Sequence, residues 1–348
     1  PHQECPMIRT LDQRLQAGPA TALGTAVSPR ALHGVLVPLD GSQLAEQALS
    51  VGVARARRTG ATLHLVSVHE PVPLAAMPPD YPMPVQDMEA EATEERLRYL
   101  ESVAAWTRTS LPTPVVASVV TGHPAAGLCE YVRTHPVDLV VMTTHGRGGL
   151  GRLWLGSVAD RMLRHVASPV LLLPSEESLQ PTEFRHVLVA LDGEIEEPVL
   201  DAAELLGCDD NRVRFTLTRV VEPAVPVLTS LAARPAHLPP DWNAKREVEA
   251  RDYLTRLADR LGTRGWDVSW HLLVGRGVAA RVLELADAIG ADAIVVGTHG
   301  ARGLERLLLG SVAGEIVHGA TVPVLVVPAT SAAERPRAPV PSPSSANA

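Results

Sequence analysis

Residues 35–41 read VLVPLDG, and the nearly identical stretch VLVALDG returns at residues 187–193. Each is an apolar run that ends in Asp-Gly, which is typical of a buried strand followed by a tight turn. The aspartates of the two stretches, Asp40 and Asp192, lie 152 positions apart. Solenoid repeats recur every 20 to 50 residues or so, and this period is roughly three times longer or more, so it indicates duplication of a whole domain.

Further matches follow in the same order in both halves of the chain, now 154 positions apart. They are Thr-His-Gly at 144–146 and 298–300, Leu-Gly-Ser-Val-Ala at 155–159 and 309–313, and Pro-Val-Leu at 169–171 and 323–325. These matches predict two copies of one fold. We expect domains over residues 31–175 and 183–329, a linker over 176–182, a flexible extension over 1–30 and a disordered tail over 330–348.

Within each copy, short β-branched runs alternate with longer amphipathic stretches, the pattern of βα units in a parallel sheet. The expected strands are 34–39, 61–68, 114–120, 138–143 and 169–174, then 186–191, 213–220, 267–274, 292–297 and 323–328. The expected helices are 43–59, 87–109, 124–134 and 156–167, then 195–206, 242–264, 276–289 and 310–320. The most apolar strands suit the centre of a sheet covered on both faces, so each copy is predicted to be a doubly wound α/β domain.

Composition excludes several classes of protein. Of 348 residues, 46% are hydrophobic and 20% charged, which is ordinary for a globular chain. The net charge of -8 and the aromatic content of 3% disfavour nucleic acid as a partner. Three widely spaced cysteines give no disulfide framework, and no run reaches the roughly 18 apolar residues of a membrane span. We therefore expect a soluble cytoplasmic protein with no membrane partner.

Copy two carries a motif suited to an anion. Gly297 and Gly300 are followed, after nine residues, by Gly310-Ser311, where a helix is expected to begin. Glycines let backbone N–H groups approach phosphate oxygens, and a helix N-terminus adds unpaired N–H groups and a positive dipole end. In an open α/β sheet, ligands bind outside the carboxyl ends of the strands where the strand order reverses. Asp192, at the end of the first strand, could there accept hydrogen bonds from ribose hydroxyls.

Copy one departs from this motif at one position, and copy two departs from copy one at another. Thr143 stands where copy two has Gly297, so copy one has less backbone freedom at that point. Glu194 stands where copy one has Ser42, which brings an acidic cluster close to the expected phosphate pocket. Acidic residues are also favoured in the first turn of any helix, so the cluster has an ordinary structural explanation as well.

Together, the strand-ending aspartate, the G-x-x-G-x9-G-S spacing, the Leu-Gly-Ser-Val core and the closing Pro-Val-Leu strand resemble the universal stress protein family. The resemblance covers residues 32–174 and 184–328, so the chain is similar to a tandem member of that family. It implies two tandem doubly wound five-stranded parallel-sheet domains of the adenine nucleotide alpha hydrolase-like type. It also implies pairing of the edge strands 169–174 and 323–328 within one chain, as a pseudo-dimer, and further pairing of two chains as a homodimer.

The same resemblance implies which residues would contact ATP. Main chain at the ends of the first two strands would hold adenine: Pro38, Leu39 and Val68, then Ala190, Leu191 and Val220. Asp40 and Asp192 would lie on the ribose or adenine side. The phosphate contacts would be Met142, Thr143, Gly146, Gly156, Ser157, Val158 and Ala159, then Val296, Gly297, Gly300, Gly310, Ser311, Val312 and Ala313. Mg would sit with the phosphates rather than on side-chain ligands.

Two functional hypotheses follow. In the first, the chain is an ATP-binding module of the stress response whose shape or assembly depends on the nucleotide. In the second, it is a nucleotide-free structural or interaction protein, as Thr143 and the cluster around Glu194 suggest. No nucleophile elbow, Walker A lysine, zinc-protease motif or catalytic carboxylate pair is present. We therefore expect no catalytic residues and at most weak ATPase activity.

Overall fold

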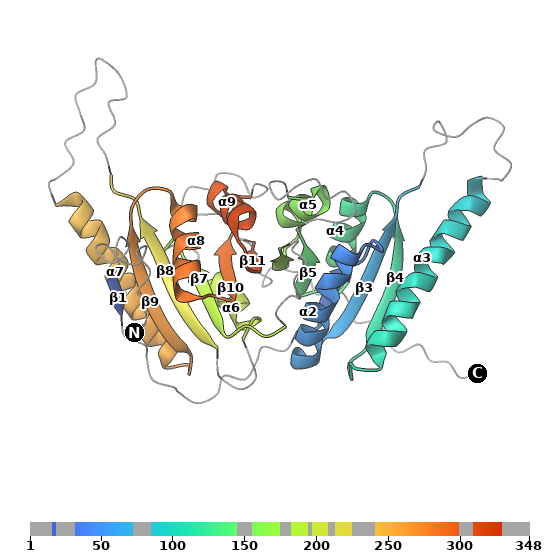
Figure 1. Ribbon diagram of the computed structural model, residues 1–348, viewed down its shortest axis with the longest axis horizontal. Helices are drawn as coiled ribbons and strands as arrows, with labels where there is room; N and C mark the ends of the chain where they lie inside the picture. The colour runs from blue at the N-terminus through green and yellow to red at the C-terminus, as the bar shows by residue number, and fades with distance from the viewer. Residues whose placement is uncertain are drawn as a thin grey trace, which may run out of the picture.

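Figure 1 shows the computed structural model of the chain. The structure describes residues 16–18, 32–71, 85–144, 155–174, 182–193, 197–207, 213–224, 241–298 and 309–328.

A single sheet of eleven strands runs through the molecule, in the order β1-β9-β8-β7-β10-β11-β6-β5-β2-β3-β4 (Figure 1). Copy one contributes β2 (Gly34–Pro38), β3 (Thr62–His69), β4 (Val115–Thr121), β5 (Leu139–Thr143) and β6 (Val170–Leu173). Copy two contributes β7 (His186–Ala190), β8 (Arg214–Val221), β9 (Asp267–Val274), β10 (Ala293–Gly297) and β11 (Val324–Val327). Within each copy all strand pairs are parallel.

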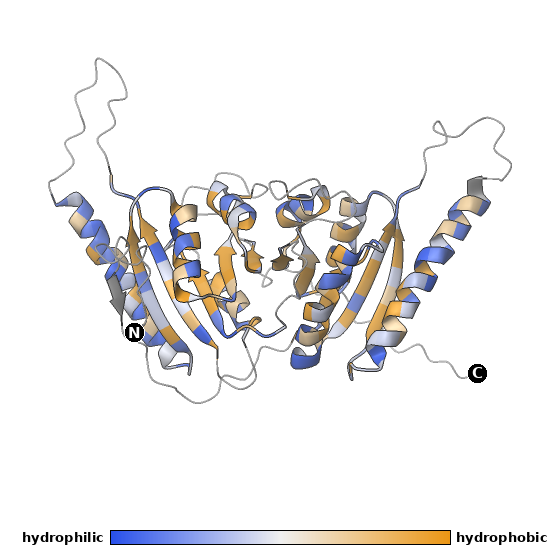
Figure 2. Ribbon diagram, viewed as in Figure 1, coloured by the Kyte–Doolittle hydropathy of each residue, from blue (hydrophilic) through white to orange (hydrophobic). Residues whose placement is uncertain are grey.

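Helices cover both faces of this sheet. One face carries α2 (Gln43–Thr59), α3 (Val85–Arg108), α6 (Glu197–Glu204) and α7 (Trp242–Gly262). The other carries α4 (Pro124–Thr134), α5 (Ser157–His165), α8 (Val278–Ile289) and α9 (Ser311–Gly319). The strands between these layers are the most hydrophobic part of the molecule (Figure 2). The predicted fold of two doubly wound α/β domains is therefore confirmed.

Alternation along the strands explains why two cores form. Val35 and Val37 of β2 pack into the cluster beneath α2 and α3, whereas Leu36 between them packs into the cluster beneath α4 and α5. Successive side chains of a strand point to opposite faces, so a strand that is apolar at every position must be covered on both sides. This is why the stretch VLVPLDG predicts a central strand rather than an edge.

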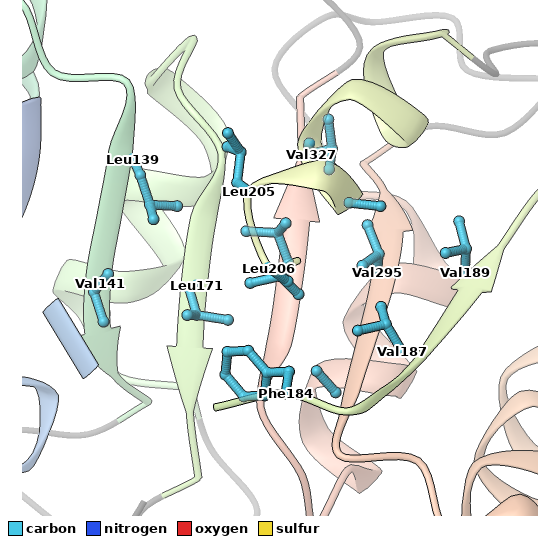
Figure 3. Close-up of a cluster of buried hydrophobic side chains, with 14 of the residues drawn as sticks. Leu139, Val141, Leu171, Phe184, Val187, Val189, Leu205, Leu206, Val295 and Val327 are labelled. Carbon is cyan, nitrogen blue, oxygen red and sulfur yellow. The ribbon is translucent and has the colours of Figure 1, made fainter. Parts of the chain in front are cut away.

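The two copies meet edge to edge. β6 pairs antiparallel with β11, and Leu171 lies opposite Leu325, which is the same position of the other copy. A pseudo-two-fold axis therefore passes through this pair, as the expected pairing of segments 169–174 and 323–328 requires. Figure 3 shows Leu171 of β6 near Leu206 and Phe184 of copy two, with Leu205 farther up in the view. All four side chains belong to the core on the face that carries α2 and α6.

Several helix ends and one short strand differ from the sequence-based expectation. α3 begins at Val85 instead of 87, and α5 and α7 end at His165 and Gly262 instead of 167 and 264. β1 (Gln16–Gly18) lies within the extension where no regular structure was expected, and it pairs antiparallel with β9. Its backbone makes the contact, so side-chain periodicity over three residues carries no signal for it. In addition, α6 ends at Glu204 instead of 206, because Leu205, Leu206 and Gly207 close with tighter bonds to the carbonyls three residues earlier.

Candidate functional site

The strand order reverses at the same point in both copies. β2 lies between β3 and β5, and β7 lies between β8 and β10. The chain runs outward from the first strand to the third and then returns to the other side of the first, which makes a topological switch point. The predicted site residues follow the first and fourth strands of each copy, so the structure brings the two groups to one edge of the sheet.

In copy one, the turn after β2 is tightly specified. Leu39 is buried, and its N–H donates to the carbonyl of Val66 at 2.8 Å. Asp40 accepts a hydrogen bond from the N–H of Ser42 on Oδ1 at 2.9 Å. The Ser42 hydroxyl accepts from the N–H of Ala45 at 3.1 Å and so caps α2. Together these bonds hold the Asp40 carboxylate beside the carboxyl end of β2.

In copy two, the equivalent turn is built differently. Leu191 repeats the backbone contact, with its N–H donating to the Thr218 carbonyl at 2.9 Å. Gly193, after Asp192, has φ of 96°, a conformation that favours glycine. A Cβ at Gly193 would lie 2.6 Å from Cζ of Arg219, so the guanidinium packs directly against this turn. The sequence patterns did not point to Arg219, which stands where copy one has Ser67. Glu194 lies outside the described residues.

Backbone hydrogen bonds join the two ends of the loop after the fourth strand in both copies. Thr144 donates its N–H to the Leu173 carbonyl at 3.0 Å and accepts from the Gly156 N–H on its own carbonyl at 2.8 Å. In copy two, Thr298 does the same with Val327 and Gly310, at 2.8 and 2.7 Å. This role was not predicted, although the repeated Thr-His-Gly carried the signal. Gly146 and Gly300, within the loops, lie outside the described residues.

The helices that follow these loops begin without a side-chain cap. Gly156 and Gly310 are the N-cap residues of α5 and α9, and neither helix has a side-chain cap hydrogen bond. The first intrahelical bonds run from Asp160 to Gly156 and from Gly314 to Gly310, each at 2.9 Å. The N–H groups of the three residues before each donor therefore need another acceptor, and an anion suits this position. Ser157, Val158 and Ala159 supply these groups in copy one; Ser311, Val312 and Ala313 supply them in copy two.

The remaining predicted residues lie at the same edge of the sheet. Val68 and Val220 occupy the ends of β3 and β8, next to the first strand of each copy. Met142, Thr143, Val296 and Gly297 end the fourth strands, and Pro38 and Ala190 end the first. Thr143 is buried, whereas Gly297 of copy two is partly exposed. Copy one thus carries a β-branched side chain at this position, and copy two carries none.

Side-chain metal ligands do not gather anywhere in the part of the chain that the structure describes: no group of three or more His, Cys, Asp or Glu residues could hold an ion. None of the helices in this part is long and apolar enough to cross a membrane. At the candidate site, the described residues offer backbone N–H groups, hydroxyls, one aspartate per copy and, in copy two, the guanidinium of Arg219, which suits binding of a polar ligand with anionic groups.

Comparisons with known proteins agree with this architecture. The family model of the Universal stress protein family matches residues 32–174 and 183–328. The universal stress protein Rv2005c of Mycobacterium tuberculosis is 31% identical over 315 residues, which is 86% of this chain and 98% of that protein. A universal stress protein from Mycolicibacterium smegmatis is 27% identical, with coverage of 85% and 97%.

Solved structures share the fold at lower identity. The crystal structure of a universal stress protein from Archaeoglobus fulgidus has a TM-score of 0.59 and 19% identity, covering 84% of this chain and 95% of that one. A putative universal stress protein from Pseudomonas aeruginosa has a TM-score of 0.52 and 18% identity, covering 85% and 93%. On the match of the family model to both copies, the chain belongs to the universal stress protein family.

Proposed function

We propose that the chain is an ATP-binding module of the stress response, with one nucleotide site at the switch point of each copy. The observation that carries the proposal is the uncapped start of α5 and α9, held at the end of a fourth strand that neighbours the first. α4, α7 and α8 also begin without a side-chain cap, but they do not begin at the switch point. At α5 and α9, three N–H groups and the helix dipole favour an anion where phosphates are expected.

The adenosine end of the ligand would lie over the first and second strands. Backbone groups of Pro38 and Leu39 in copy one, and Ala190 and Leu191 in copy two, lie at the ends of the first strands beside an aspartate. The bond from Ser42 to its Oδ1 positions Asp40 to accept from a ligand hydroxyl or amine. Each site would therefore hold a nucleotide at both ends. Mg, where it binds, would be held by the phosphates, because the described residues offer no cluster of ligands for it.

The two sites are proposed to differ in affinity. Copy one carries the β-branched Thr143 at the end of its fourth strand, where copy two has Gly297. A glycine allows closer approach of the backbone to a ligand than a β-branched residue does. We therefore assign the tighter site to copy two. The domain boundaries at 31–175 and 183–329, a cytoplasmic location and pairing of two chains as a homodimer also belong to this proposal.

Thr143 also supports the second candidate, a nucleotide-free structural or interaction protein. One experiment separates the two candidates: mass spectrometry and ultraviolet absorbance of small molecules released from the freshly purified, denatured protein, with MgATP titrated into the stripped protein. Released ATP, or binding of added MgATP, supports the ATP-binding module. Neither release nor binding would leave the structural candidate standing.

Variants at the helix starts assign the sites. Ser157→Asp and Ser311→Asp each place a carboxylate at the first position of a helix, where it stabilises the helix but repels a phosphate. Both serines are exposed, so the fold tolerates the change. We expect each Asp variant to lose nucleotide at its own copy, with Ser311→Asp causing the larger loss. Ser157→Ala and Ser311→Ala are the matched controls that remove the hydroxyl without adding charge.

A further inference from the structure

The seam between the copies contains a fully buried arginine. Arg55, on α2 of copy one, has an exposed fraction of 0%. Its Nη1 donates to the carbonyls of Leu206 at 3.1 Å and Leu205 at 3.4 Å, and its Nη2 donates to the carbonyl of Thr182 at 2.5 Å. The Cζ atom lies 5.0 Å from the ring centroid of Phe184. All of these partners come from copy two or from the approach to it, so Arg55 acts across the seam.

The carbonyls are available because α6 stops early. Leu205, Leu206 and Gly207 bond back to residues three positions earlier, so the helix closes and leaves its last carbonyls without helical partners. A cation is favoured at the C-terminal end of a helix. A second arginine of α2, Arg58, donates to the Gly207 carbonyl at 2.7 Å and extends the same contact. The buried guanidinium of Arg55 therefore depends on the carbonyls that the early end of α6 leaves available in copy two.

Arg55 and Leu206 are counterparts when α6 is aligned with α2 on its buried face. Buried positions 48, 49, 51, 52 and 55 of α2 then match 199, 200, 202, 203 and 206, at an offset of 151 that is one residue shorter than the 152 of the strands on either side. The contact between Arg55 and the Leu206 carbonyl therefore joins equivalent positions, close to the pseudo-two-fold axis through Leu171 and Leu325. The axis makes each position near it face its own counterpart. Figure 3 shows Leu206 at this place in the seam, beside Leu171.

The buried Arg55 would affect a pair of two copy-one domains and a pair of two copy-two domains differently. If two copy-one domains paired across their β6 edges, two Arg55 guanidiniums would face each other. Neither would find free carbonyls, because α2 continues in helical form to Thr59. A buried charge left without its acceptors is strongly destabilising, and a like charge nearby adds to this. Two copy-two domains would instead bring together two Leu206 side chains, and this pairing would bury no charge.

We propose that Arg55 makes the seam surface of copy one selective for copy two, so that the partner of this surface is a copy-two domain and never a second copy-one domain. β6 is a short, apolar strand whose backbone alone would pair with any similar edge. Selectivity then comes from a repulsive element at one position rather than from the strand itself. The proposal concerns pairing of domains and is independent of nucleotide binding.

Cross-linking of two matched positions tests the proposal in the full chain. With Cys5, Cys129 and Cys208 replaced, Leu171→Cys reports pairing of two copy-one domains from different chains, since residue 171 then faces residue 171. Leu325→Cys reports pairing of two copy-two domains in the same way. Both leucines are fully buried and lie opposite each other, so their substitution costs are matched. Each variant is unfolded, refolded under oxidising conditions and analysed for disulfide-linked dimers.

We expect Arg55→Leu to raise the 171–171 dimer, relative to the 325–325 dimer, by about tenfold or more, since a buried charge without acceptors is worth at least that factor. Arg55→Lys keeps the charge but loosens the seam, and it should leave the 171–171 dimer low. If Arg55→Leu refolds poorly, Arg55→Met, which also removes the charge and is closer in length to arginine, takes its place with the same expected rise. An equal rise of both dimers in both variants, or no rise in either, would show that Arg55 only holds the seam together and would overturn the proposal.

Discussion

A buried histidine of copy one gives a pH dependence whose size can be worked out. His64, on β3, is 4% exposed, and its Nδ1 lies 3.0 Å from the hydroxyl of Tyr131. Its Nε2 is buried and has no hydrogen-bond partner within the described structure. Desolvation by burial, with a smaller contribution from His135, lowers the pKa of His64 from 6.5 to about 4. The charged form of this imidazole is therefore strongly disfavoured in the folded protein.

The difference between the pKa of His64 in the folded and the unfolded chain makes the stability of the fold depend on pH. Between pH 6.5 and about 4, the unfolded chain binds a proton at His64 that the folded chain does not, so acid destabilises the fold. The stability is complete above the unfolded pKa and falls as the pH drops toward the folded one. Lowering the pH from 7.5 to 5 should cost about 2 kcal/mol at this residue alone. His186 and His271, whose pKa values burial also lowers, act in the same direction.

Urea denaturation followed by circular dichroism at pH 7.5 and pH 5 measures this loss. His64→Thr is the matched variant, because copy two carries Thr216 at the equivalent strand position and packs there without a charge change. We expect the free energy of unfolding to fall between the two pH values by about 2 kcal/mol less in His64→Thr than in the wild type. An equal fall in both proteins would refute the reasoning, since the acid sensitivity would then come from other groups.

Two further predictions concern the turns of the candidate sites. Ser42→Ala removes the cap of α2 and should cost about 1 kcal/mol of stability in chemical denaturation, whereas Ser50→Ala, at an exposed position within the same helix, should change it little. Gly193→Ala meets both a positive φ and the guanidinium of Arg219, whereas Gly60→Ala meets a positive φ with nothing within 4 Å. The positive φ should lower the melting temperature of both variants, and the difference between them should be small because the guanidinium is the flexible end of a side chain and can move away; a much larger fall for Gly193→Ala would show that Arg219 is held rigidly against the turn.

Much of the fold could be predicted from the sequence because its signals are local. α2 and α4 begin and end at the predicted residues, since Ser42 and Gly60 bound the first and Pro124 opens the second. The strands of both copies agree to within one residue at each end, because continuous apolar runs flanked by glycine, proline or charge leave little freedom. The repeat alone then predicts that Asp40 and Asp192 lie at equivalent edges of the sheet.

The remainder depends on contacts between distant segments, which no local pattern encodes. The early end of α6 makes room for Arg55, which is 150 residues from Leu205 along the chain, although a helical pattern continues through Leu205 and Leu206 in the sequence. The placement of Arg219 against Gly193 depends on the register of β7 and β8. The glycines at 146 and 300 lie outside the described residues, so the predicted role of the loop interior stays a prediction.

The most direct test of nucleotide binding at the two switch points is calorimetric titration of MgATP into nucleotide-stripped protein. Three proteins are compared: the wild type, Ser157→Asp/Ser311→Asp and Ser157→Ala/Ser311→Ala. We predict saturable binding to the wild type and the alanine variant, and loss of binding in the aspartate variant, whose helix starts repel phosphate. Unchanged affinity in the aspartate variant, or no binding to the wild type, would contradict nucleotide binding at these helix starts.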